Sequence, residues 1–148
     1  MDLVANFALG RKIKTMSEDE KTSFSQLFEQ NMILMWTLRF NEYQGQRIEF
    51  FDEKVSDNKK DVFVNSKIID DKKVSDPAID VVWRLRKTDD SYKIIDIIIS
   101  NISMLKTYQS EYSAFLNQNG GEISALLNML KEKNENYKKE MEKLKSKA

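Results

Sequence analysis

The sequence predicts an α+β domain: an antiparallel, strongly curved sheet of about four strands, packed by a long N-terminal helix and by C-terminal helices around an apolar pocket. Helical signals run from residue 17 to about residue 43 and return after residue 103, whereas residues 46–100 are rich in Val, Ile and aromatic side chains. Short clusters of turn residues separate the strand-like segments, and such short connections favour antiparallel neighbours. A chain of 148 residues is one domain's worth and can bury one sizeable core.

The long N-terminal helix is predicted to begin at a capping box, residues 17–20 (SEDE), in which the Ser hydroxyl and Glu20 each satisfy a free backbone N–H. We expect this helix to run to about Tyr43, with Gly45 as its left-handed stop. Its first half is amphipathic, and one stripe carries Phe24, Leu27, Phe28 and Met32. Residues 32–40 (MILMWTLRF) are apolar almost all the way round, which predicts that this half is covered on most sides.

Four segments have the composition of strands: residues 47–55, 62–69, 79–87 and 92–100. The third alternates, so that its apolar side chains share one face while its charged side chains lie on the other. The apolar set is Ile79, Val81, Trp83 and Leu85. The fourth segment does not alternate, because it has Ile at positions 94, 95, 97, 98 and 99, and this favours a central strand with both faces covered.

Helical spacing returns from Met104 to Leu116, is broken at residues 119–121 (NGG) and begins again at Ile123. We expect residues 132–148 to form a charged helical tail, either solvated or frayed. Seven residues from Ile123 onward keep heptad spacing and permit a coiled coil. They are Ile123, Leu127, Leu130, Asn134, Tyr137, Met141 and Leu144.

The composition excludes several classes of function. Lys plus Arg and Asp plus Glu both number 24, so no net charge attracts nucleic acid. There is no His and no Cys, which removes the usual nucleophilic pairs and zinc sites. An enzyme would have to use a base such as Asp96 or Tyr108. Because a buried acid in mid-strand needs a partner, we expect instead that Asp96 forms a structural ion pair with Arg84 or Arg86. The sequence therefore predicts no catalysis, no cofactor and no metal.

Two features of the sequence allow both a structural and a functional interpretation. Residues 32–40 can be an ordinary buried helix or one wall of a cavity, and the seven Met residues suit a wall that adapts to its cargo. The cations Arg39, Arg47, Arg84, Arg86 and Lys87 can form a basic rim around the mouth of a pocket or simply a solvated face of the sheet.

Five segments, in order, resemble the signature segments of one family. They are residues 7–11 (FALGR), 43–50 (YQGQRIEF), 82–87 (VWRLRK), 92–96 (YKIID) and 102–109 (ISMLKTYQ). The family is that of the toluene-tolerance, or MlaC-type, periplasmic phospholipid carriers, and the resemblance runs from about Leu3 to about Lys131. Many relatives have an acid and a Gly where this chain has Ser100 and Asn101.

The resemblance implies a domain, residues 1–131, whose helices and sheet enclose the acyl tails of a phospholipid. It also implies that the carrier works in the periplasm, as a monomer, between an outer-membrane lipoprotein complex and an inner-membrane ABC transporter of the Mla type, supporting outer-membrane lipid asymmetry in a Gram-negative bacterium. Family members carry an export signal and further helical sequence before the first segment, and we expect this domain to lack both. The alternative is a non-catalytic protein-interaction domain with a filled core.

With the apolar pattern, this resemblance predicts a set of lipid-binding residues. They are Phe28, Met32, Met35, Trp36, Phe40, Val81, Trp83, Leu85, Ile97, Ile99, Leu105, Tyr108 and Tyr112.

Overall fold

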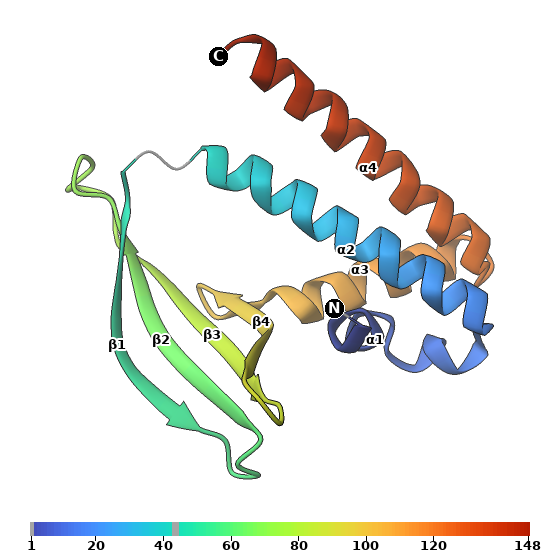
Figure 1. Ribbon diagram of the computed structural model, residues 1–148, viewed down its shortest axis with the longest axis horizontal. Helices are drawn as coiled ribbons and strands as arrows, with labels where there is room; N and C mark the ends of the chain where they lie inside the picture. Colours follow the sequence, from blue (N-terminus) through green and yellow to red (C-terminus); the bar gives the residue numbers. More distant parts are fainter. Residues whose placement is uncertain (1, 43–44) are drawn as a thin grey trace. The chain divides into compact units, whose positions relative to one another are not determined.

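The computed structural model describes residues 2–42 and 45–148, and it confirms the predicted α+β class. Helices precede and follow an antiparallel sheet (Figure 1). The chain forms two compact units. Met1–Tyr43 with Gln109–Ala148 is called the helical unit below, and Gln44–Tyr108 is called the sheet unit.

The sheet unit is an open meander with the strand order β1-β2-β3-β4-β5. Its strands are β1 (Arg47–Val55), β2 (Asp61–Ile69), β3 (Ile79–Lys87), β4 (Tyr92–Ile99) and β5 (Ile102–Ser103). The first four agree with the predicted segments to within one residue at each end. The short β5, paired with the end of β4, extends the sheet beyond the four strands predicted.

A β-bulge explains why β4 lacks alternation. Arg84 of β3 pairs with Asp96, but Leu85 pairs with Ile94, so Ile95 is an extra residue in β4. Ile95 is buried, whereas Ile94 is exposed. The prediction that both faces of this strand are covered is therefore wrong for Ile94.

The turn between β4 and β5 has both of its residues in the left-handed region of backbone conformation. Ser100 and Asn101 both have positive φ, at 49° and 68°. A two-residue hairpin loop with positive φ at both positions matches the twist of the strands and is adopted most easily by Gly or Asn. The Ser-Asn pair therefore adopts this turn at some conformational cost to Ser100.

The helical unit begins with α1 (Asp2–Leu9), a 3₁₀ helix (Gly10–Thr15) and the long helix α2 (Glu18–Asn41). The predicted capping box is present, because the Ser17 hydroxyl accepts from the Glu20 N–H and the Glu20 carboxylate accepts from the Ser17 N–H. The C-cap of α2 is Glu42, and the predicted end at Tyr43 lies outside the described residues. Gly45 has the expected positive φ of 84° but lies beyond this cap.

A close approach explains why Gly follows α1. Gly10 has a φ of 58°, and a Cβ placed there would lie 2.5 Å from Nε2 of Gln109. That Nε2 donates a hydrogen bond to the Phe7 carbonyl, near the end of α1. Residues 7–11 and the last residue of the segment 102–109 therefore meet at one contact.

The last two helices are α3 (Met104–Gln118) and α4 (Ile123–Ser146). Gly120 and Gly121, both with positive φ, interrupt the chain between them as predicted. α3 begins in the sheet unit and continues into the helical unit from Gln109. α4 continues without interruption through the predicted tail.

The core of the helical unit is aromatic and aliphatic. The rings of Phe24 and Phe28 stack at 5.7 Å, and Tyr112 packs edge-on against both. Leu116, Leu126 and Leu130 of the same unit are also fully buried, so this core is filled with side chains.

A polar pair interrupts the contact between α2 and α4. Asn31 and Asn134 are both buried, and Nδ2 of Asn31 donates to Oδ1 of Asn134 at 2.9 Å. The amide of Asn134 in turn donates to the Leu27 carbonyl and to the Gln30 side chain. Asn134 occupies one of the predicted heptad positions, so part of the expected tail packs against α2.

Candidate functional site

One face of the sheet is almost wholly apolar. Cross-strand partners share a face and successive residues alternate, so the register assigns each side chain to one of two faces. The members of the apolar face are Ile48, Phe50, Val55, Val62, Val64, Ile68, Ile79, Val81, Trp83, Leu85, Ile94, Ile97 and Ile99. Five predicted lipid-binding residues, on β3 and β4, thus lie on one surface.

Polar groups within this face are satisfied or peripheral. Ser66 is buried at its centre, where its hydroxyl accepts from Nε1 of Trp83 at 2.9 Å and donates to the Val81 carbonyl at 2.8 Å. The indole N–H therefore needs no other partner. Glu53 lies on the edge strand β1 and is exposed. The centre of the face thus presents carbon surface.

Much of the apolar face is accessible. Phe50 is 64% exposed and Val55 is 54% exposed on β1, and Ile79 and Ile94 are exposed on β3 and β4. Contiguous exposed apolar surface of this kind marks a binding site on a soluble domain more often than it marks chance.

The apolar half of α2 is also incompletely covered. Met32 is buried, and Met35 and Trp36 are half-buried. Ile33 and Phe40, by contrast, are 57% and 59% exposed. The Trp36 and Phe40 rings lie 5.8 Å apart. The prediction that this half is covered on most sides is therefore wrong for Ile33 and Phe40.

The remaining predicted residues lie in three places. Phe28 and Tyr112 are fully buried in the aromatic core beside Phe24. Leu105 and Tyr108 are half-buried on the first turns of α3. The predicted set thus belongs to both units, and its assembly into a single lipid site stays a prediction.

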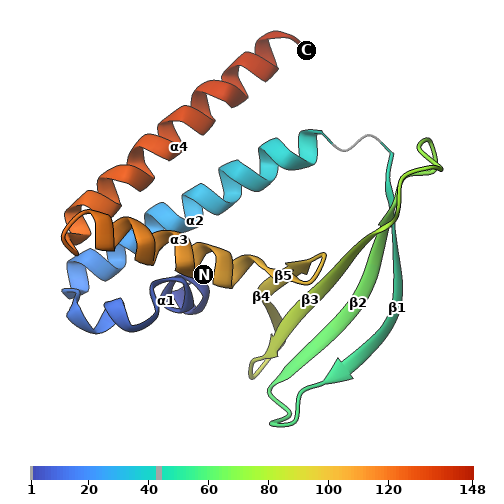
Figure 2. The same ribbon diagram turned by 180° about the vertical axis from the view of Figure 1, so that it is seen from behind.

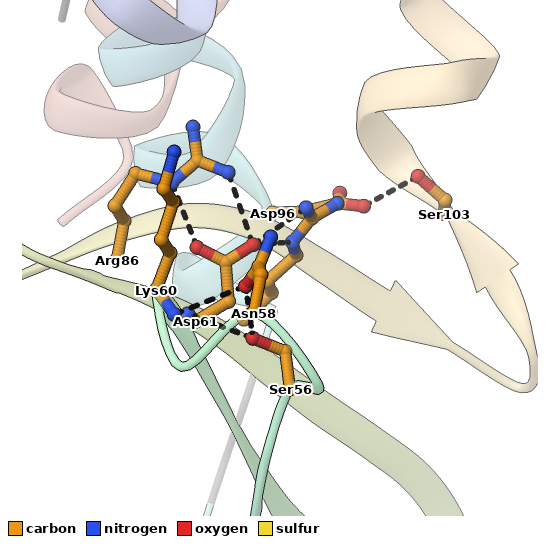
Figure 3. A network of polar contacts seen from close by, with 8 residues as sticks. Ser56, Asn58, Lys60, Asp61, Arg86, Asp96 and Ser103 are labelled. Atoms are coloured by element: carbon orange, nitrogen blue, oxygen red, sulfur yellow. Dashed lines mark hydrogen bonds and ion pairs between the residues drawn. The ribbon is translucent and has the colours of Figure 1, made fainter.

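The opposite face of the sheet carries an ion cluster around Asp61 (Figure 3). From the sequence, one of its arginines is expected to pair with Asp96. Asp61 of β2, which is 2% exposed, accepts from Arg84 and Arg86 of β3 at distances of 2.6–3.0 Å. The hydrogen bond from Arg86 is the largest cause that lowers the pKa of Asp61 to about 2; burial opposes it, and Arg84 adds to it. Asp61 and Arg86 are direct cross-strand partners.

Asp96 is buried as predicted but has different partners. Its carboxylate accepts from the Ser103 hydroxyl and from the backbone N–H groups of Ile97 and Leu105. It therefore ties β4 to the first turn of α3, where the positive end of the helix dipole favours a carboxylate. The predicted ion pair of Asp96 with Arg84 or Arg86 is wrong, because both guanidinium groups bond Asp61.

The predicted basic rim is largely neutralised. Arg47 pairs with Asp71 and with Glu49, and both contacts raise its pKa. Arg84 and Arg86 pair with Asp61. Arg39 lies over the Trp36 ring, 6.0 Å from its centroid.

Across the described ranges, no group of three or more carboxylate, His or Cys side chains could hold a metal ion. In the same part of the chain, no helix has the length and apolar character needed to cross a bilayer.

Sequence reasoning missed the central residues of two polar clusters. Asp61 was missed because it follows a run of turn residues at the start of a strand, where an acid is expected on the surface. Its cross-strand position opposite Arg86 was the only available signal. Asn134 was recognised as a heptad position, but Asn31 on α2 was not recognised as its partner.

Comparison with known proteins adds to this geometry. The family model described as MlaC protein matches residues 1–132. Among solved structures, the chain is similar to the phospholipid-binding protein from Ralstonia solanacearum in complex with a phospholipid, with a TM-score of 0.77. That match has 18% sequence identity and covers 92% of this chain and 73% of the other, so it shows a shared fold. No curated protein matches the chain.

Proposed function

Because the chain belongs to the MlaC family, we propose that it is a phospholipid carrier whose cargo places its acyl tails against the apolar face of the sheet. The observation that carries this proposal is the continuity of that face, in which the one central polar side chain, Ser66, is bonded to Trp83 and to the β3 backbone. The similar Ralstonia solanacearum protein was solved in complex with a phospholipid, which supports the same class of cargo.

The energetics suit a carrier rather than a catalyst. A two-chain phospholipid has roughly thirty methylenes, each worth about 0.8 kcal/mol when buried, so bare tails in water cost on the order of 20 kcal/mol. The carrier must cover most of that surface and release it where a membrane protein offers an equivalent site. Nothing in this task breaks or forms a covalent bond.

The setting of this activity is part of the proposal. We propose that the carrier works in the periplasm, as a monomer, between an outer-membrane lipoprotein complex and an inner-membrane ABC transporter of the Mla type. In this proposal residues 1–131 are the lipid-binding domain, and the exposed apolar half of α2 supplies further contacts to the tails through Met35, Trp36 and Phe40.

Lipid analysis of the purified protein tests the proposal. We expect about one diacyl phospholipid per chain in native mass spectrometry, and uptake of phospholipid from vesicles by protein stripped of lipid. The substitution Ile97→Glu places a charge on the apolar face and should abolish uptake. Val74→Glu is the matched control, because Val74 is 87% exposed in the loop between β2 and β3 and lies off that face.

Repeated preparations that contain no lipid and take none up would disprove the carrier. Stable, lipid-free protein would then favour the protein-interaction domain. Equal uptake by wild type and by a folded Ile97→Glu variant would place the tails elsewhere.

A further inference from the structure

A hydrogen bond at the centre of the apolar face fixes the direction of the Trp83 side chain. The two strands that it joins, β2 and β3, lie side by side within the sheet (Figure 2). Ser66 of β2 lies opposite Val81 of β3, and Trp83 is two residues farther along β3 on the same face. Diagonal neighbours of this kind are within reach of an aromatic side chain. Nε1 of Trp83 donates to the Ser66 hydroxyl at 2.9 Å, so the indole reaches from β3 toward β2.

The Ser66 hydroxyl acts toward the indole only as an acceptor. A hydroxyl has one proton, and Ser66 donates it to the Val81 carbonyl at 2.8 Å. The lone pairs of the same oxygen are therefore the part that meets the Trp83 N–H. Ser66 is 3% exposed, so water has little access to either bond. The backbone of β3 thus orients the hydroxyl, and the hydroxyl orients the indole.

This arrangement removes the polar atom of the largest side chain on the apolar face from contact with cargo. Trp83 is half-buried, so part of its ring stays accessible while its N–H is bonded within the sheet. A buried indole N–H needs a partner, because an unsatisfied donor costs free energy. Without Ser66, water would bind the N–H of the empty protein. That water would have to leave when hydrocarbon covers the ring, and acyl tails would therefore bind more weakly.

We propose that Ser66 is a positioning residue for lipid binding: it holds the N–H of Trp83 so that the indole presents only carbon to acyl tails. This inference rests on the proposed carrier function, because it requires that the tails cover the apolar face. It adds a polar residue to a set that was predicted from apolar side chains alone. Ser66 acts through Trp83 and not through contact with the lipid.

A double-mutant cycle of Ser66→Ala and Trp83→Phe tests the proposal. Protein stripped of lipid is titrated with vesicles of phosphatidylglycerol, and the apparent Kd is measured for the wild type and the three variants. Ser66→Ala alone should raise the Kd by about tenfold, because the indole N–H loses its acceptor. The Trp83→Phe protein has no such N–H, so adding Ser66→Ala should change its Kd by less than about twofold. The bond from Ser66 to Val81 is lost in both backgrounds, so a merely structural role of Ser66 would give equal effects.

Indole fluorescence of the lipid-free protein gives an independent readout. The chain has two Trp residues, so Trp83 is the sole indole of a Trp36→Phe protein. Adding Ser66→Ala should shift the emission to longer wavelength, because water then reaches the N–H. Ser66→Cys keeps a similar shape but offers a weaker acceptor, so it should give a smaller shift and a smaller rise in Kd. This variant keeps the test valid if Ser66→Ala fails to fold.

Two results overturn the proposal. One is an equal change of Kd in the two backgrounds, or no change in either. The other is an unshifted emission, because the environment of the indole then does not depend on Ser66. Failure of the carrier is a different result, in which the wild type itself takes up no phosphatidylglycerol. That result overturns both proposals, whereas failure of this one alone leaves wild-type uptake intact.

Discussion

The helical unit and the sheet unit treat their apolar side chains in opposite ways. In the helical unit the large side chains interlock, and Phe24, Phe28 and Leu130 are at most 1% exposed. In the sheet unit, Val81 and Ile95 are the buried apolar residues among those described. The most deeply buried side chain of that unit is a carboxylate, Asp61, whereas most of its apolar face is exposed or half-buried.

This contrast separates a scaffold from the surface that we propose binds lipid. A filled core contributes stability but leaves no space for cargo, because interiors are packed as densely as organic crystals. An open apolar face gains its favourable burial only when something covers it. The sheet is held instead by backbone pairing and by the polar contacts of Asp61 and Asp96, which lie on the opposite face. The proposed lipid-binding surface and the polar contacts that stabilise the sheet thus lie on different faces.

The largest expected effect comes from matched truncations in the two units. Phe28→Ala leaves a cavity in a filled core and should lower the free energy of unfolding by about 3–5 kcal/mol. Phe50→Ala removes a similar side chain from the open face and should change it by less than about 0.5 kcal/mol. Chemical denaturation measures both. A small effect at Phe28, together with lost lipid, would show that Phe28 lines a cavity, as the sequence predicted.

The ion cluster provides a pH-dependent test of the sheet unit. Asp61→Asn should destabilise by about 1–3 kcal/mol, because it weakens charge-assisted hydrogen bonds from two guanidinium groups. The pKa of Asp61 is lowered to about 2, below the usual value near 3.9, so the stabilisation is complete above about pH 4 and is lost as the pH falls through about 2. Thermal unfolding between pH 2 and pH 6 should show this slope in wild type and a shallower one in the variant.

Asp80→Asn is the control for that cluster. Asp80 and Lys67 are separated by 3.8 Å and are both exposed, so their loss should cost less than about 0.5 kcal/mol at any pH. Equal effects at Asp61 and Asp80 would contradict the role given to the buried carboxylate.

The asparagine pair tests whether the helical scaffold extends into the charged tail. Asn134→Ala leaves the buried Asn31 amide without its acceptor and should cost about 1–3 kcal/mol. Replacing both residues with Leu should recover much of that loss, because no polar group is then left unsatisfied. If Asn134→Ala has no effect on urea denaturation, the tail is independent of the scaffold.

The smallest expected effect is the difference between two glycine substitutions, at Gly10 and at Gly120. Gly10→Ala should cost about 1–2 kcal/mol for the positive φ alone, and more because its Cβ would meet Gln109. Gly120→Ala is the matched control, since Gly120 has a φ of 66° and nothing within 4 Å of the added Cβ. The difference between the two losses of stability isolates the contact between the segment 7–11 and Gln109. Equal losses would mean that Gln109 moves aside freely.

Local signals predicted most of the fold. The capping box at Ser17 placed the start of α2, and the alternation of Ile79, Val81 and Trp83 placed the faces of β3. Both depend on residues close in sequence. The same period of two predicted that Val81, Trp83 and Leu85 share one surface of β3, and the register places Ile97 and Ile99 of β4 on that surface. Whether these residues bind lipid stays a prediction.

What could not be predicted depends on pairings between distant residues. Asp96 was assigned to Arg84 or Arg86 because an acid in mid-strand needs a partner on the neighbouring strand. The choice between Asp61 and Asp96 depends on the directions of two long side chains. The bulge at Ile95 and the meeting of Asn31 with Asn134 likewise depend on tertiary register. How far α2 is covered could not be predicted either, because composition shows that Phe40 is apolar but not whether a neighbour reaches it.

The placement of the two units along the chain has a consequence for biosynthesis. The sheet unit is one uninterrupted segment of neighbouring hairpins, so its strands can pair in order as they leave the ribosome. The helical unit is made from both ends of the chain, and Asn31 is separated from its partner Asn134 by 103 positions in the sequence. Until α3 and α4 have been translated, the aromatic side chains of α2 lack Tyr112 and the leucines that cover them in the finished core. During that interval the nascent chain is at its most vulnerable to aggregation and proteolysis, and any premature stop before α4 releases a chain with a pairable sheet and no closed scaffold.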